Sequence, residues 1–170
     1  MRISTIVRSG AVSVVLLGLL TACGTAAPTA QRTPARTPDR TLAAVEEAVA
    51  EIPGADFRAA RAWDGTTAYV TATLSATDAF TGDPGALVDY SLAQLASQDE
   101  VDRGRFVRFA FDAPGQTVES TIAILATLDI ASEQYAGGDS VELSSSDLDA
   151  RYGSWPGEVP TLPAALGGAG

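Results

Sequence analysis

The segment FRAARAWDGTTAYVTATLS, residues 57–75, decides the expected fold. It holds two alternating runs, 57–63 and 67–75, on either side of Asp64-Gly65. An Asp-Gly pair between alternating runs is a strong signal for a β-hairpin. The second run places apolar residues on one face (Val70, Ala72, Leu74) and Tyr69, Thr71 and Thr73 on the other. We therefore expect a hairpin with one face on a core and the other in water.

A helix is expected immediately before the hairpin. Thr41 is a suitable N-cap, and a single helical face follows it: Leu42, Val45, Val49 and Ile52. The IPG segment, residues 52–54, ends this helix because proline cannot continue it and glycine suits the exit.

A second unit of the same kind is expected downstream. GDPGALVDYSLAQLAS, residues 82–97, predicts a helix with Asp83 as N-cap and Pro84 in its first position. Two apolar runs then follow, 105–112 and 117–127, and we interpret both as strands. The sequence thus predicts an α+β domain with an αββαββ duplication. Two helices would pack on one face of an antiparallel four- to five-stranded sheet.

The expected folded domain covers residues 41–152. Within its last part, SVELS (140–144) is a short candidate fifth strand. SSSDLDARYG (144–153) predicts a short helix with a serine cap and Gly153 at its end. Residues 153–170 are rich in proline and glycine, so we expect a flexible tail there.

The N-terminus has the pattern of a secretory signal. Residues 1–9 carry two arginines and no acid, and residues 10–20 are small or apolar. About 20 apolar residues are needed to cross a membrane, so this run is too short for a transmembrane helix. It ends Leu20-Thr21-Ala22-Cys23-Gly24, and Cys23 is the only cysteine of the chain.

This segment resembles the lipobox of bacterial lipoproteins, in which leucine and two small residues precede a cysteine. The resemblance covers residues 1–24 only. It implies a signal peptide over 1–22, a diacylglycerol on the sulfur of Cys23 and cleavage before Cys23. It also implies a protein anchored to the extracytoplasmic face of the cell membrane through fatty acids such as palmitate. The alternative is an ordinary buried or free cysteine.

Residues 23–40 form the expected tether between anchor and domain. The segment is rich in threonine, alanine and proline, and its three arginines are spaced four apart: Arg32, Arg36 and Arg40. A proline-rich chain of this length extends to about 50 Å. The simplest interpretation is a solvated spacer, and the alternative is that the arginines contact anionic headgroups. The threonines are also potential sites of O-glycosylation.

Charge and composition exclude several functions. Residues 41–170 hold 20 acidic residues against six arginines, a net charge of −14. Nucleic acid is therefore not an expected partner, whereas a small molecule or a protein with a basic patch is. The chain has no histidine and no lysine, which removes the usual general base and Schiff-base chemistry. We expect no cofactor and no enzymatic activity.

Four arginines stand out because they lie in or beside the first strand of each expected unit: Arg58, Arg61, Arg105 and Arg108. Cross-strand pairing with Asp and Glu is the simplest account of them. The functional alternative is a sheet-face patch for an anionic or aromatic ligand. That patch would consist of Arg58, Arg105 and Arg108, with Tyr69 and Phe106 as its apolar part.

An acidic and hydroxyl-rich cluster near the C-terminus is a second candidate site. Asp139, Glu142, Asp147 and Asp149 offer the oxygen ligands that Ca²⁺ prefers. Their spacing matches no EF-hand loop, and helix capping already explains part of the cluster.

The sequence as a whole favours a membrane-anchored binding or interaction module of unknown ligand. The alternatives are a structural or envelope-stress lipoprotein without a small-molecule ligand and, third, a carboxylate-dependent hydrolase. An open sheet face lined by arginine and aromatic residues would favour binding. A sheet face covered by the C-terminal segment would favour the structural role, and a buried carboxylate pair in a cleft would favour the hydrolase.

Overall fold

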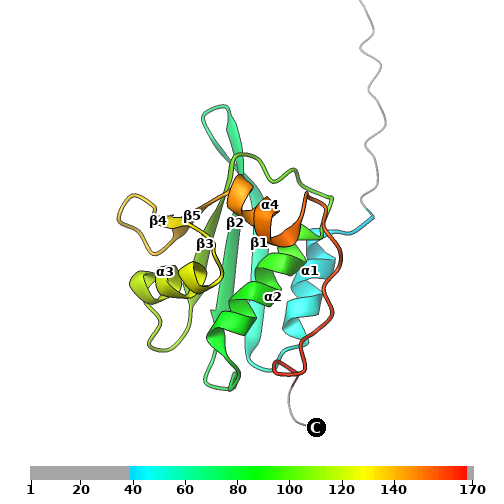
Figure 1. Ribbon diagram of the computed structural model, residues 1–170, viewed down its shortest axis with the longest axis vertical. Coiled ribbons are helices and arrows are strands. Elements are labelled where there is room, and N and C mark those ends of the chain that lie inside the picture. The colour runs from blue at the N-terminus through cyan, green and yellow to red at the C-terminus, as the bar shows by residue number, and fades with distance from the viewer. Residues whose placement is uncertain (1–38, 168–170) are drawn as a thin grey trace, which may run out of the picture. The chain divides into compact units, whose positions relative to one another are not determined.

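The computed structural model describes residues 39–167 (Figure 1). Cys23, the expected signal peptide, nearly all of the expected tether and residues 168–170 lie outside this part. The elements in chain order are α1 (Leu42–Ala50), β1 (Ala55–Asp64), β2 (Thr67–Ala76), α2 (Pro84–Ala96), β3 (Phe106–Asp112), α3 (Val118–Thr127), β4 (Ser132–Gln134), β5 (Val141–Ser144) and α4 (Ser145–Tyr152). No helix among the described residues is long and apolar enough to span a membrane.

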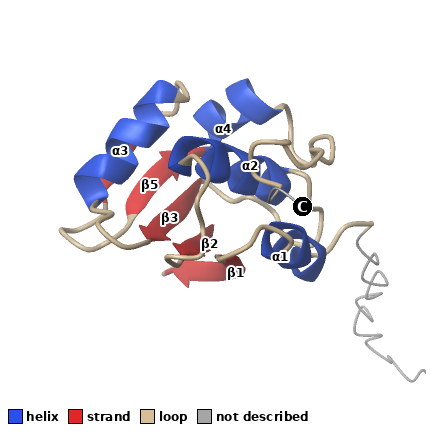
Figure 2. Cartoon of the chain, turned by 90° about the horizontal axis from the view of Figure 1, so that it is seen from below, coloured by secondary structure: helices blue, strands red, loops and turns tan. Residues whose placement is uncertain are grey.

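The fold is α+β, with four helices on one side of a five-stranded mixed sheet (Figure 2). The strand order is β1-β2-β3-β5-β4. β2 and β3 are parallel, whereas the other three neighbouring pairs are antiparallel. The prediction of an all-antiparallel sheet was therefore wrong. A parallel pair needs a crossover connection, and α2 lies in the segment that joins β2 to β3.

The first unit forms as predicted. The Thr41 side chain accepts a hydrogen bond from the Ala44 N–H at 3.1 Å and caps α1. The hairpin turns at Gly65, where φ is 58°, a value that glycine adopts without strain. Pairing of Phe57 with Leu74 then places both side chains in the core, where each is fully buried.

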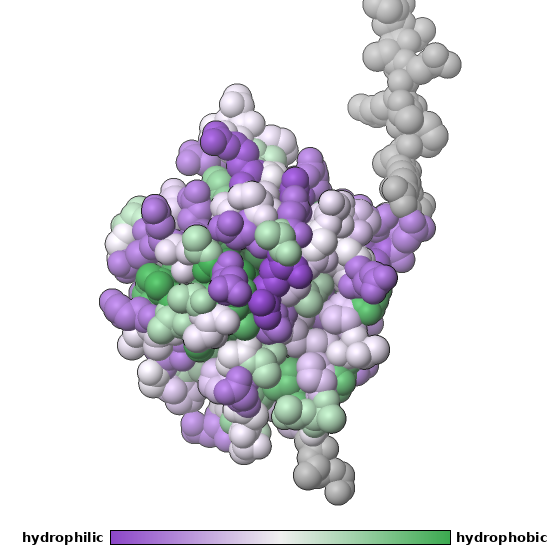
Figure 3. Space-filling view, viewed as in Figure 1, coloured by the Kyte–Doolittle hydropathy of each residue, from purple (hydrophilic) through white to green (hydrophobic). Residues whose placement is uncertain are grey.

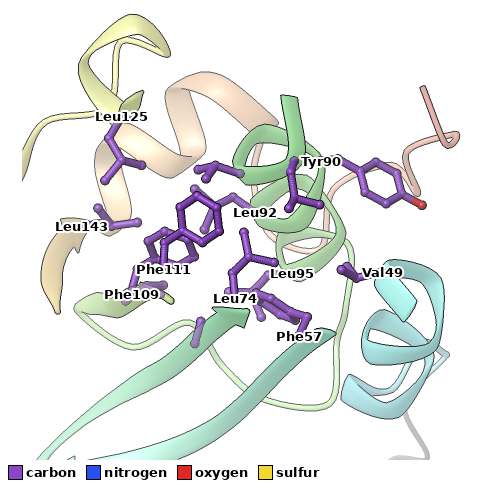
Figure 4. Close-up of a cluster of buried hydrophobic side chains, with 14 of the residues drawn as sticks. Val49, Phe57, Leu74, Tyr90, Leu92, Leu95, Phe109, Phe111, Leu125 and Leu143 are labelled. Carbon is purple, nitrogen blue, oxygen red and sulfur yellow. The ribbon is translucent and has the colours of Figure 1, made fainter. Parts of the chain in front are cut away.

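The core lies between the helices and the sheet. α2 begins with the predicted Asp83 cap and Pro84, and its apolar stripe is buried: Leu87, Val88, Leu92 and Leu95. Side chains from β2, β3 and α2 converge in this layer, among them Leu74, Leu92 and Phe109 (Figure 4). The alternation predicted for β3 is also present, since Val107, Phe109 and Phe111 are buried.

Residues 117–127, expected as a strand, contain the helix α3. Thr117 and Ser120 form a reciprocal capping box at its start. The apolar side chains that contact the core follow helical spacing, with Val118 and Ile122 partly buried and Leu125 fully buried. The β-branched residues of this run suggested a strand, but the cap and the burial pattern favour a helix. The αββαββ duplication is therefore absent.

The C-terminal elements are partly as expected. The SVELS segment forms β5, and α4 follows it with Ser144 as N-cap and Gly153, at φ 84°, as C-cap. β4 has three residues and was not predicted.

Residues 153–167 pack on the domain, although their composition suggested a flexible tail. Trp155 Nε1 donates to the Leu95 carbonyl at 2.8 Å, and the Gly157 N–H donates to the Ala96 carbonyl at 2.8 Å. Leu166 is 3% exposed and belongs to the core. A few large apolar side chains thus hold a segment that is otherwise rich in proline and glycine. At the other boundary, Arg40 is also part of the fold because its N–H donates to Asp99 Oδ1 at 2.9 Å.

Candidate functional site

The face of the sheet that no helix covers carries the first candidate site (Figure 2). On β3, Val107 and Phe109 point into the core, so Phe106 and Arg108 point to the opposite face. On β2, Tyr69 has the same orientation as Arg108 because Val70 is paired with Val107. The structure thus brings together three of the predicted patch residues.

These residues form a compact group, which we call the Arg108 cluster: Tyr69, Phe106, Arg108 and Tyr135. The rings of Tyr69 and Phe106 stack with centroids 4.8 Å apart and an interplanar angle of 17°. The Arg108 guanidinium lies 3.4 Å from the Tyr135 ring centroid and 4.6 Å from that of Tyr69. Arg108 Nη1 also donates to the Tyr69 hydroxyl at 3.2 Å. Arg108 is therefore held by aromatic rings on more than one side.

The charge of Arg108 has no direct carboxylate partner. Within the described residues Arg108 forms no ion pair, although Glu142 is its register partner on β5. Its Nε is buried without a hydrogen-bond partner. Contact with the faces of aromatic rings stabilises a cation, but it leaves guanidinium N–H donors without acceptors. The chemistry that fits such a group is the binding of an anion, above all a carboxylate or phosphate.

Two other predicted patch residues lie outside the cluster. Arg58 forms ion pairs with Glu46 at 2.9 Å and Asp56 at 3.1 Å, so local acid pairing accounts for it. Arg105 precedes β3, and its side chain is exposed. Its backbone N–H donates to the Ala68 carbonyl.

Tyr135 is the cluster residue that sequence analysis missed. It follows β4 in the loop QYAGG, where no alternation or helical spacing signals its direction. Only the pairing of β4 with β5, and of β5 with β3, brings it to Arg108.

The four candidate Ca²⁺ ligands are not gathered into one group in the described residues. No three acidic, cysteine or histidine side chains gather as a metal site in the described part of the chain. Asp149 instead forms an ion pair with Arg103. The Asp147 N–H donates to the Ser144 cap, Glu142 lies on β5, and Asp139 is exposed in the loop before it.

A polar network on the helix side fastens α4 to α2. Arg151 donates to both carboxylate oxygens of Asp89, at 2.8 and 3.0 Å, and the Tyr152 hydroxyl donates to Asp89 at 2.9 Å. Burial alone would raise the pKa of Asp89, but these bonds and the charge of Arg151 outweigh it and lower the pKa. Burial and the neighbouring carboxylate raise the pKa of Tyr152.

This network borders an open groove of about 420 Å³ between α2, α4 and residues 160–163. On the same side of the domain, polar and apolar residues are interspersed over the surface (Figure 3).

No carboxylate is among the buried polar side chains of the described residues, which are Ser91, Gln94, Ser97, Gln98 and Thr121. The groove therefore offers no buried carboxylate pair for acid–base chemistry.

No family model, curated protein or solved structure matches this chain at a significant level.

Proposed function

We propose that this protein is a membrane-anchored extracytoplasmic lipoprotein whose domain binds an anionic ligand on its open sheet face. Lipidation of Cys23 would provide the anchor, and residues 24–38 the tether. The Arg108 cluster would provide the binding site. The domain is otherwise strongly acidic, so an anion would be recognised by this local group and not by the overall field.

The observation that carries this proposal is that Arg108 is held by aromatic rings and has no carboxylate partner among the described residues. Three other arginines are ion-paired: Arg58, Arg103 and Arg151. Arg108 is instead placed between aromatic rings, with only a tyrosine hydroxyl as hydrogen-bond acceptor. A guanidinium prepared in this way needs little side-chain ordering when a ligand arrives, which favours binding.

The position of the C-terminal segment also supports a binding role. Trp155 and Gly157 attach this segment to the C-terminal end of α2, on the helix side of the sheet. The open sheet face is therefore not covered by it. A purely structural lipoprotein would have less reason to leave Phe106, Arg108 and Tyr135 partly exposed on this face.

The ligand class that fits best is a planar carboxylate attached to an aromatic or apolar group. The terminal nitrogens of Arg108 would bind the carboxylate, and the rings of the cluster would provide apolar contact. Benzoate, acetate and inorganic phosphate are simple probes that separate these contributions. We expect benzoate to bind more tightly than acetate.

The proposal can be tested by calorimetric titration of the soluble Cys23→Ser chain with the three probes. Arg108→Gln should abolish the binding of benzoate. Arg58→Gln is the matched control, because it removes the same charge from the same sheet face but outside the cluster. Equal losses in both variants would show a general charge effect and contradict the proposed site.

One observation favours the alternative of a structural lipoprotein without a ligand. The rings around Arg108 already stabilise its charge, so the cluster would also be stable when empty. Absence of binding for all three probes would favour this alternative.

A further inference from the structure

The tip of the β1–β2 hairpin carries an exposed tryptophan. Trp63 is 61% exposed, more than any other large apolar side chain in the described part of the chain. The turn of the hairpin projects past the helices (Figure 1). An exposed indole ring at this tip is available for contact with the headgroup level of a bilayer.

Two arginines without ion pairs lie at the same end of the sheet as Trp63. Arg61 precedes Trp63 by two residues on β1, and its side chain is exposed. Trp63 pairs with Ala68 on β2, and the Ala68 carbonyl accepts the N–H of Arg105 at 3.4 Å. Neither arginine forms an ion pair within residues 39–167. We call Arg61, Trp63 and Arg105 the hairpin pole.

The hairpin pole lies at the end of the domain where the tether joins it. The chain reverses at residues 51–54, between α1 and β1. Glu46, in the middle of α1, accepts the N–H of Ala59, in the middle of β1. The helix and strand therefore run in opposite directions, and Thr41 lies towards the end of β1 that carries Trp63. Cys23 is only 16 residues before Asp39, the first described residue.

We propose that the hairpin pole docks on the phospholipid surface to which the chain is anchored. This inference rests on the lipid anchor of the proposed function. Tryptophan favours the headgroup level of a bilayer, and arginine binds lipid phosphate. Asp64 at the turn offsets part of the positive charge, so the contact is weak by itself. The anchor makes this weak contact intramolecular and thereby raises its occupancy.

Docking of this kind would orient the domain. The hairpin pole would meet the membrane with the strands pointing towards it, because Trp63 and Gly65 lie at the strand ends. The open sheet face would then stand beside the membrane and remain accessible to a ligand at the Arg108 cluster.

The chain contains two tryptophans, which makes a direct test simple. In a lipidated Trp155→Phe chain, Trp63 is the only tryptophan. The probe is a vesicle of phosphatidylcholine and phosphatidylglycerol with a doxyl-labelled lipid as quencher. We expect Trp63 emission to shift to shorter wavelength and to be quenched when the chain is in vesicles. The reciprocal Trp63→Phe chain, which retains Trp155, should show neither effect.

Flotation of the same samples separates the two proposals. A chain that floats with the vesicles while Trp63 emission stays unchanged would overturn docking and leave the anchor intact. A chain that does not float would overturn the anchor and docking together.

Trp155 is partly buried, so Trp155→Phe is first checked by circular dichroism. If that variant unfolds, the difference between the wild-type and Trp63→Phe spectra isolates the Trp63 signal. Arg61→Ser/Arg105→Ser should reduce the quenching, and unchanged quenching would remove the arginines from the proposal.

Discussion

Replacing Phe109 by alanine tests the two faces of β3, on which the binding site depends. Phe109 is fully buried in the layer between α2 and the sheet. Removing its ring costs the transfer free energy of the lost atoms and leaves a cavity. Together these amount to about 3–5 kcal/mol. The total stability of a domain of this size is about 5–15 kcal/mol. Phe109→Ala should therefore lower the urea midpoint strongly and reduce the amount of folded protein.

Arg108→Ala is the matched variant, one position away on the other face. It loses one hydrogen bond to Tyr69, worth about 0.5–1.5 kcal/mol, and ring contacts worth about 0.5–1 kcal/mol. The expected loss in the free energy of unfolding is therefore about 1–2.5 kcal/mol, less than the loss expected for Phe109→Ala. Urea unfolding followed by far-ultraviolet circular dichroism measures both. Equal losses would mean that Arg108 is interior, and the sheet-face site would be refuted.

Three further predictions concern the anchor, the C-terminal segment and the α2–α4 network. Cys23→Ala should leave unprocessed precursor and abolish labelling with palmitate; a variant that still takes up the label would disprove the lipobox. Leu166→Ala should cost about 2–5 kcal/mol because Leu166 is buried; a neutral effect in urea unfolding would support a loose tail. The pKa of Asp89 is lowered from its ordinary value of 3.8 in the folded protein. Ionised Asp89 therefore stabilises the fold at pH values above 3.8, and this stabilisation is lost as the pH falls through the folded pKa. Asp89→Asn should thus be less stable than wild type at neutral pH, with a difference that shrinks in acid; a constant difference would contradict the ionised pair.

The local signals in the sequence predicted the first half of the fold well. The Asp64-Gly65 turn, the Thr41 cap and the alternation of β2 each act over a few residues, and all three are present. The helix α2 was similarly marked by Asp83 and Pro84. These features depend on residues close together in the chain, so they can be predicted from the sequence alone.

The errors arose where distant contacts decide the structure. The run 117–127 contains β-branched residues that suit either a strand or a helix, and burial of Leu125 against the core selects the helix. β2 and β3 are parallel because α2 forms the crossover between them; the sequence predicted α2 but not which strands pair. The segment 153–167 is ordered by Trp155 and Leu166, which find partners far away in sequence.

In the candidate site, too, local patterns were predicted correctly and contacts between distant residues were missed. Alternation correctly placed Tyr69, Phe106 and Arg108 on one face, but it also suggested Arg58, which is ion-paired elsewhere. Tyr135 could not be found from sequence because it reaches Arg108 only through the order of strands. The exposure of Trp63 was equally unpredictable, since its alternation matches that of the buried Phe57 on the same strand.

The central claim is that the open sheet face binds an anion through the Arg108 cluster. The most direct measurement is a titration of the ¹⁵N-labelled soluble chain with benzoate, followed by amide and arginine side-chain resonances. We expect saturable shifts at Tyr69, Phe106, Arg108 and Tyr135, including the Arg108 Nε–H, and no change at Ala93 and Tyr152 in the groove. Shifts confined to the groove, or no saturable shift at the Arg108 cluster, would show that this cluster is not the binding site.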